Sequence, residues 1–218
     1  MSAARPVLVM AGGTSGHVFP ALAVAARLRA RGAPVAWMGT RNGLEATLVP
    51  QAGIPVEWIE VTGLRGKGLG QKLRMPFMLG RALFQAGAIL RRLRPRVVLG
   101  MGGFASGPGG AMARGVGIPL VVHGQNAIPG LAHRGRSRLA DRVLEGFPGT
   151  FAPACRAQAV GNPVRAEIAA LPPPAERFAG RAGQPRLLVL GGSQGARALN
   201  QMVPQALALL EPDERPEV

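Results

Sequence analysis

The chain has 218 residues, of which 47% are hydrophobic and 17% charged, with 32 glycines, 20 prolines and a formal net charge of +15. This length and composition exclude a disordered protein and favour a globular α/β fold with many tight turns. Cys155 is the only cysteine, which excludes an internal disulfide and a cysteine metal cluster and is typical of a reducing compartment. The sequence shows neither a signal peptide nor an apolar run of about 20 residues, so we expect a cytoplasmic protein.

Short apolar stretches alternate with helical patterns along the first 145 residues. We expect strands at residues 6–10, 35–38, 56–61, 96–100, 118–122 and 142–144. Between them we expect helices at residues 19–31, 44–52, 76–93 and 131–140, and one that ends near Gly115. This alternation predicts parallel βαβ units in a doubly wound, Rossmann-like sheet.

The opening pattern returns after a proline-rich segment at residues 171–183. We expect a strand at 186–190, a glycine loop at 191–195 and a helix at 196–210. This weak internal repeat predicts a first domain over residues 1–163 and the start of a second Rossmann-like domain over residues 164–218. One strand–helix unit cannot bury both faces of a sheet, so we expect the second domain to be incomplete.

The positive charge is concentrated in one segment. Residues 61–140 contain no Asp or Glu but carry 13 of the 26 Lys and Arg residues. A general excess of arginine would not empty one segment of acidic residues, so we expect an anionic partner there: phosphate, anionic lipid or nucleic acid. Aromatic residues are only 4% of the chain, and no nucleic-acid-binding motif is present, which argues against nucleic acid as a partner.

Three glycine-rich loops follow predicted strands, at residues 12–16, 102–110 and 191–195. In a parallel sheet such loops lie at the carboxyl ends of the strands, where helix N-termini present free amides, so we expect phosphorylated ligands. A dinucleotide oxidoreductase is disfavoured, because the G-x-G-x-x-A spacing at residues 100–105 lacks an acidic residue about 20 positions later. No P-loop motif is present.

His17 is the best candidate for acid–base catalysis among the three histidines. It ends the first loop where a helix begins, and a helix N-terminus disfavours the cationic imidazole. A neutral imidazole there can act as a base toward a sugar hydroxyl, although a loop histidine bonded only to backbone is the commoner case. His123 ends a predicted strand at the same edge, and His133 lies in a basic stretch. Since no two histidines have metal-ligand spacing, we predict no bound metal.

Six motifs occur in order along the chain, at residues 12–23, 63–68, 102–108, 125–126, 161–165 and 191–196. They include Gly-Gly-Thr-Ser-Gly-His at 12–17, Gly-Gly-Phe-Ala-Ser-Gly-Pro at 102–108 and Gly-Gly-Ser-Gln-Gly-Ala at 191–196. Together they resemble the MurG family, which adds N-acetylglucosamine to a lipid-linked muramyl-pentapeptide in peptidoglycan synthesis. The resemblance covers essentially the whole chain and implies a GT-B fold, with the active site between two Rossmann-like domains.

The resemblance also implies roles for individual residues. UDP-N-acetylglucosamine is expected to contact Thr14, Ser15, Gly16, Asn126, Arg165 and Ser193. The diphosphate of an undecaprenyl-diphosphate-linked acceptor is expected at the first two glycine loops, which include Gly13, Gly102, Gly103, Ser106 and Gly107. His17 is the candidate base for an inverting transfer by direct attack, and no cofactor is implied.

Two positions depart from the family pattern. Ser15 stands where the family usually has glycine, and Gly124 stands where its His-Glu-Gln-Asn motif has glutamate. The second departure removes a carboxylate that is a candidate base or supporting group. Two alternatives stay open: a fragment that binds acceptor or membrane without catalysis because it lacks the donor half, and a nucleotide-sugar epimerase on the same two-domain fold.

Residues 72–84 mix large apolar and basic side chains around a predicted helix start. A core-facing helix is favoured for Leu79, Leu83 and Leu90, but the remaining apolar residues do not fit the same stripe. Exposed apolar residues would enter a bilayer while basic residues meet anionic head groups. We therefore predict peripheral attachment to the cytoplasmic face of the bacterial inner membrane through Lys72, Arg74, Phe77, Arg81 and Phe84.

Overall fold

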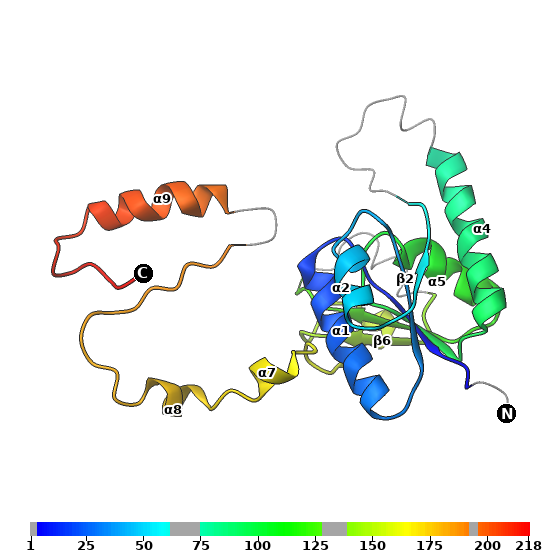
Figure 1. The fold of residues 1–218 in the computed structure, drawn as a ribbon, viewed down its shortest axis with the longest axis horizontal. Helices are drawn as coiled ribbons and strands as arrows, with labels where there is room; N and C mark the ends of the chain where they lie inside the picture. The colour runs from blue at the N-terminus through cyan, green and yellow to red at the C-terminus, as the bar shows by residue number, and fades with distance from the viewer. Residues whose placement is uncertain (1–3, 62–74, 128–138, 192–195) are drawn as a thin grey trace. The chain divides into compact units, whose positions relative to one another are not determined.

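The computed structural model of the chain describes residues 4–61, 75–127, 139–191 and 196–218 (Figure 1). The chain divides into two compact units, Met1–Ala169 and Ala170–Val218. The domains expected at residues 1–163 and 164–218 stay a prediction.

The first unit is built on a parallel seven-stranded sheet with the order β3-β2-β1-β4-β5-β6-β7. Its strands are β1 (Val7–Met10), β2 (Val35–Gly39), β3 (Val56–Trp58), β4 (Val97–Gly100), β5 (Leu120–Gly124), β6 (Arg142–Glu145) and β7 (Gln158–Ala159). From β1 the chain winds outward to β2 and β3, and then crosses back to β4 on the other side of β1. The ends of β1 and β4 therefore form the topological switch point, where open α/β sheets bind their ligands.

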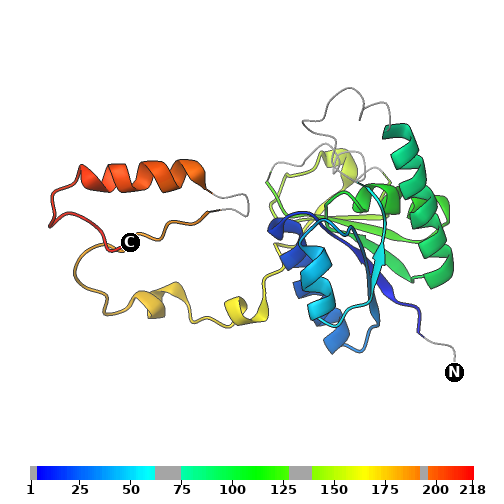
Figure 2. The same ribbon diagram turned by 45° about the horizontal axis from the view of Figure 1, so that its top comes forward.

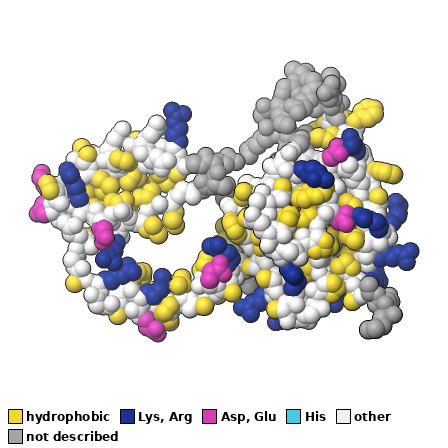
Figure 3. All heavy atoms as spheres, in the orientation of Figure 1, with side chains coloured by type: hydrophobic (Ala, Val, Ile, Leu, Met, Phe, Trp, Pro, Cys, Tyr) yellow, Lys and Arg dark blue, Asp and Glu magenta, His cyan; other side chains and the backbone are white. Residues whose placement is uncertain are grey.

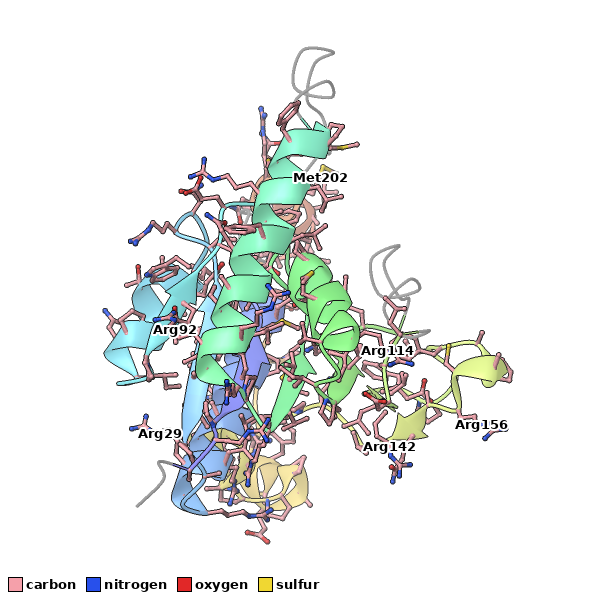
Figure 4. The ribbon with its side chains drawn as sticks, turned by 90° about the vertical axis from the view of Figure 1, so that its right-hand side faces the viewer. Arg29, Arg92, Arg114, Arg142, Arg156 and Met202 are labelled. Atoms are coloured by element: carbon pink, nitrogen blue, oxygen red, sulfur yellow. The ribbon has the colours of Figure 1, made fainter. Side chains whose placement is uncertain are left out.

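Helices cover both faces of this sheet (Figures 1 and 2). The helices α1 (Ser15–Ala30) and α2 (Glu45–Gln51) lie on one face, and α4 (Met75–Leu93) and α5 (Ser106–Gly115) lie on the other. Figure 4 shows α4 and α5 side by side, with Arg92 extending from α4 toward β3. There its guanidinium pairs with the carboxylate of Glu57 at 2.5 Å.

The core consists of two apolar layers, one on each face of the sheet. In β1, Val7 and Val9 pack with the α1 side, whereas Leu8 and Met10 pack with the α4 and α5 side. All four residues of β1 are buried, because a central parallel strand is covered by helices on both sides. This is why β1 reads as a continuous apolar run in the sequence.

The six strands expected in the first 145 residues are confirmed, and the sheet gains the short β7, which was not predicted. The first helix begins at Ser15 rather than at residue 19. Pro20 lies inside this helix, where it cannot donate a hydrogen bond to the carbonyl of Gly16, and this made the earlier start hard to recognise. Most of the helix expected at 131–140 lies outside the described residues.

The second unit contains α8 (Pro174–Phe178) and α9 (Arg197–Ala208), while the short α7 (Ala166–Ala169) ends the first unit. The expected helix at 196–210 is confirmed as α9. The expected strand at 186–190 is wrong, since among the described residues this segment makes a single isolated bridge, between Arg186 and Glu217. A strand needs a hydrogen-bonded neighbour along its length. The side chains of this segment are also not packed in a core, since Leu188 and Leu190 are 79% and 73% exposed.

Candidate functional site

The first two glycine loops meet at the switch point, beyond the ends of β1 and β4. Gly103 has a φ of +79°, and a Cβ atom added to it would lie 2.7 Å from the backbone nitrogen of Gly12. Gly102 has a φ of +116°, and its added Cβ would lie 2.6 Å from Nε2 of His17. Only glycine allows this close approach together with these backbone conformations. The two loops therefore form one continuous surface.

The helix start beside these loops presents backbone amides. Thr14 is the N-cap of α1, and its carbonyl accepts from the amides of His17 (3.1 Å) and Val18 (3.2 Å). No hydrogen bond between described residues uses the amides of Thr14, Ser15 or Gly16. The first turn of α1 contains no acidic residue. These three amides, together with the helix dipole, favour an anion at this position.

His17 lies half-buried in the first turn of α1, with its ring against Gly102. Its Nδ1 is 3.3 Å from Oγ1 of Thr14. A tautomer that carries the proton on Nδ1, and donates it to Thr14, places the basic lone pair on Nε2. Gly102, in the loop after β4, thus packs against the imidazole of His17 at the start of α1.

Buried side chains hold both loops from below. The indole Nε1 of Trp37 donates to the carbonyl of Ala11 at 2.9 Å. Oγ of Ser106 lies 2.9 Å from the carbonyl oxygen of Met10 and 2.5 Å from that of Gly102. Ser106 was predicted to lie in an acceptor-binding loop; its side chain is fully buried, and its single hydroxyl proton is donated to one of these two carbonyls. Gly107 follows it in α5.

Glu45 is a site residue that the sequence reasoning missed. Its carboxylate is fully buried and accepts the amide of Gly13 at 2.8 Å. The other carboxylate oxygen accepts the amide and the hydroxyl of Thr40 at 3.0 and 2.7 Å. The feature of the sequence that could have indicated it is an acidic residue two positions after the motif Gly-Thr-x-x-Gly at residues 39–43, which directly follows a buried strand.

The other residues predicted to contact UDP-N-acetylglucosamine lie at different places in the chain's structure. Arg165 stacks its guanidinium over the ring of Phe19 in α1, 5.2 Å from the ring centroid, and lies 3.5 Å from Glu167. Arg165 therefore sits near the start of α1. Asn126 is exposed beyond β5, and its carbonyl accepts from Oγ1 of Thr150 at 3.4 Å. Ser193 lies outside the described residues.

The N-terminal half of α4 carries exposed aromatic side chains. Phe77 and Phe84 are 86% and 76% exposed, and Arg81 lies between them at helical spacing, paired with Glu60 at 2.8 Å. Figure 3 shows hydrophobic and basic side chains together along this part of the first unit. Leu90 is buried as expected, whereas Leu79 was assigned to the core and is 46% exposed. Lys72 and Arg74 lie outside the described residues.

A cavity of about 820 Å³ lies between the start of α4 and the ends of β2 and β3. Its lining includes Arg41, Trp58, Phe77 and Arg81, and the guanidinium of Arg41 lies 5.1 Å from the ring centroid of Trp58. Within the described ranges, no helix is long and apolar enough to cross a membrane. No group of three or more potential metal ligands occurs there either.

Residues 7–145 match the family model of the glycosyltransferase family 28 N-terminal domain. This match covers more than half of the chain. The chain belongs to glycosyltransferase family 28. The match begins at β1 and ends with β6, so it includes both glycine loops and the switch point between them.

Two relatives share the name UDP-N-acetylglucosamine–N-acetylmuramyl-(pentapeptide) pyrophosphoryl-undecaprenol N-acetylglucosamine transferase. The protein of Nitrosococcus oceani is 61% identical over 97% of this chain and 59% of its own length. That of Xanthomonas euvesicatoria is 59% identical over 94% of this chain and 47% of its own length. The chain thus spans about half the length of these relatives.

Solved structures show the same fold. The crystal structure of MurG from Acinetobacter baumannii matches with a TM-score of 0.74 and 39% identity, over 95% of this chain and 58% of that chain. The kitacinnamycin glycosyltransferase matches with a TM-score of 0.62 at 18% identity, over 94% of this chain and 64% of that chain, which supports the fold alone. The expected Rossmann-like first domain of a GT-B glycosyltransferase is confirmed.

Gly124, which departs from the family pattern, is closely packed. A Cβ atom added to it would lie 2.7 Å from Cε2 of Phe151, so any side chain there requires Phe151 to move. Glu145 is its register neighbour on β6, but this carboxylate accepts the amides of Gly149 (3.0 Å) and Phe151 (3.1 Å). The carboxylate of Glu145 therefore holds the loop after β6.

His123, the residue before Gly124, is buried and structural. Its Nε2 lies 3.0 Å from the carbonyl of Gly161 and donates to it, while Nδ1 is buried and has no hydrogen-bond partner among the described residues. Burial lowers the pKa of His123 below its ordinary value of 6.5, and the hydrogen bond to Gly161 opposes this only partly. The neutral form is therefore favoured at neutral pH.

This pKa predicts a pH-dependent stability. As the pH falls through 6.5, the unfolded chain takes up the proton first, so the free energy of unfolding decreases until the pH is below the folded pKa. His123→Gln keeps a donor for Gly161 but does not titrate. We expect the wild type to lose more stability than His123→Gln between about pH 7.5 and about pH 5, measured by urea unfolding. Equal losses would contradict the assignment.

Proposed function

We propose that the chain forms the acceptor side of an inverting glycosyltransferase. The enzyme would move N-acetylglucosamine from UDP-N-acetylglucosamine to an undecaprenyl-diphosphate-linked muramyl-pentapeptide. One observation carries the proposal: the 61% identity, over 97% of the chain, to the Nitrosococcus oceani protein of that name. The contact between the two glycine loops supports it, because it joins anion-binding amides to a candidate base.

The acceptor diphosphate would bind where the two loops meet. The amides of Thr14, Ser15 and Gly16 supply donors at the positive end of the α1 dipole. The lack of acidic residues in segment 61–140, which includes the second loop, reduces repulsion of a diphosphate. Gly13, Gly102, Gly103 and Gly107 would let the backbone approach the phosphates, while the buried Ser106 hydroxyl would support the loop.

His17 would be the base. As the acceptor hydroxyl oxygen attacks the anomeric carbon of the donor, its proton would pass to the imidazole lone pair on Nε2. The bond between that carbon and the diphosphate oxygen breaks, and UDP leaves with the electron pair. Attack from the opposite side inverts the configuration, with no covalent sugar–enzyme intermediate. The residues proposed to contact UDP-N-acetylglucosamine are Thr14, Ser15, Gly16, Asn126, Arg165 and Ser193. The first three belong to the loop whose amides face the acceptor diphosphate, so the two substrates would meet at this loop.

The transfer can be tested by joining this chain to the remaining C-terminal part of the Nitrosococcus oceani relative. With UDP-N-acetylglucosamine and a short-chain lipid-linked acceptor, we expect UDP release that requires the acceptor. His17→Ala should lower kcat by about 10²- to 10⁴-fold, because the proton acceptor is lost. Its unfolding temperature should stay close to that of the parent.

Three results would contradict this proposal. These are UDP release that does not depend on the acceptor, epimerisation of the donor sugar without transfer, and unchanged turnover in His17→Ala. The first two would overturn the proposed reaction, and the second would favour the epimerase alternative. The third would remove His17 from the catalytic role.

The exposed face of α4 would bring the protein to its lipid substrate at the cytoplasmic side of the membrane. Phe77 and Phe84 would enter the acyl boundary, and Arg81 would meet anionic head groups. Each basic residue near an anionic surface contributes about 1 kcal/mol, and each buried aromatic side chain adds to this.

Vesicle binding tests this attachment. We expect the chain to bind vesicles that contain phosphatidylglycerol and to bind neutral vesicles more weakly. The double variant Phe77→Ser, Phe84→Ser should reduce affinity by about 10-fold or more, since two exposed aromatic anchors are lost. Phe178→Ser is the matched control, because Phe178 is 53% exposed and is also flanked by arginines. Equal binding to neutral vesicles, or equal loss in the control, would overturn the proposed face.

A further inference from the structure

Glu45 occupies an unusual position for a carboxylate. It is the first residue of α2, its side chain has no solvent exposure, and none of the ion pairs between described residues includes it. Its three hydrogen-bond donors are the amide of Gly13 and the amide and hydroxyl of Thr40. Burying a carboxyl group away from water costs free energy, which these three hydrogen-bond donors partly offset.

Three glycines make room for this carboxylate. A Cβ atom added to Gly12 would lie 2.7 Å from Cδ of Glu45, and one added to Gly43 would lie 2.6 Å from the same atom. A Cβ added to Gly39 would lie 2.8 Å from Cγ. The Glu45 side chain therefore passes between three glycines: Gly12 after β1, Gly39 at the end of β2 and Gly43 in the turn before α2.

The carboxylate acts on one peptide plane of the first glycine loop. The Gly13 amide points at Glu45, so in a trans peptide the carbonyl of Gly12 points the opposite way. That carbonyl belongs to the backbone against which Gly103 packs. The same turn is fixed a second time, because the amide of Leu44 donates to the carbonyl of Gly13 at 3.5 Å.

We propose that Glu45 is a positioning residue, which fixes the peptide between Gly12 and Gly13 so that the amides of residues 14–16 face the diphosphate and His17 lies against Gly102. The inference rests on the proposed function, because it assigns a diphosphate to those amides. Glu45 itself does not touch the substrate, since its carboxylate is buried beneath the loop.

The substitution Glu45→Gln isolates this role. A carboxamide has one acceptor oxygen and one NH₂ group, so in either orientation its NH₂ faces a backbone donor, that of Gly13 or that of Thr40. Thr40→Val is the matched control: it removes the hydroxyl bond to the same carboxylate and keeps the bond to Gly13. Gly43→Ala is a second variant, in which an added methyl group displaces the carboxylate without removing its charge.

The test uses the full chain and two measurements. Hydrogen exchange by NMR reports the Gly13 amide, with the amide of the buried Leu90 as an internal reference. Titration with inorganic pyrophosphate reports the anion site. In Glu45→Gln and in Gly43→Ala we expect faster exchange at Gly13, unchanged exchange at Leu90, and an affinity for pyrophosphate lower by about 10-fold or more. Thr40→Val should stay within about 3-fold of the wild type.

The outcomes separate the two proposals. Unchanged Gly13 exchange in both Glu45→Gln and Gly43→Ala, or equal loss of affinity in Glu45→Gln and Thr40→Val, overturns the positioning role and leaves the proposed function standing. If Gly13 exchanges faster in the variants but the wild type does not bind pyrophosphate, the positioning role is supported and the proposed function is contradicted. If Glu45→Gln does not fold, Gly43→Ala decides by the same criteria.

Discussion

The structure of the site depends on a close backbone contact between Gly12 and Gly103. This contact joins the loop after β1 to the loop after β4 at the point where the strand order reverses. It needs a residue without a side chain and with a positive φ at position 103, a combination that glycine alone provides without strain. Because the loops touch, His17 in the first turn of α1 packs on Gly102 of the second loop, and the amides at the start of α1 open onto the same surface.

Buried hydrogen bonds support the backbone around this contact. The indole of Trp37 donates to the carbonyl of Ala11, the carboxylate of Glu45 accepts the amide of Gly13, and the hydroxyl of Ser106 donates to the carbonyl of Met10 or of Gly102. Groups that bind an anion gain most when they are held in place beforehand, because no ordering cost then opposes binding. The buried polar side chains thus connect the core of the sheet to the chemistry proposed at its edge.

Much of this arrangement could be predicted from the sequence, because parallel sheets place the ends of neighbouring strands at one edge. The glycine loops after predicted strands, together with the basic segment, led to the prediction of an anion site near His17, which stays a prediction. The inward direction of Ser106 could not be predicted, since a serine in a glycine loop reads equally well as a ligand. The exposure of Leu79 depends on how α4 packs against the sheet, which helical spacing alone does not determine.

Other features needed the three-dimensional structure for a different reason. Glu45 is 32 residues from Gly13 in the chain, and only the pairing of β1 with β2 brings them together. Residues 186–190 have the composition of a strand, but composition does not show whether a neighbouring strand is present to form hydrogen bonds with them. Gly124 was recognised as a departure from the family, whereas its packing against Phe151 depends on the loop after β6.

If the two loops form one diphosphate site, an NMR titration of the chain with geranyl diphosphate detects it. We expect the amides of residues 14–16 and of Gly102 and Gly103 to shift together along a single binding curve. Shifts confined to one loop, or centred instead on the arginines of α4, would contradict it.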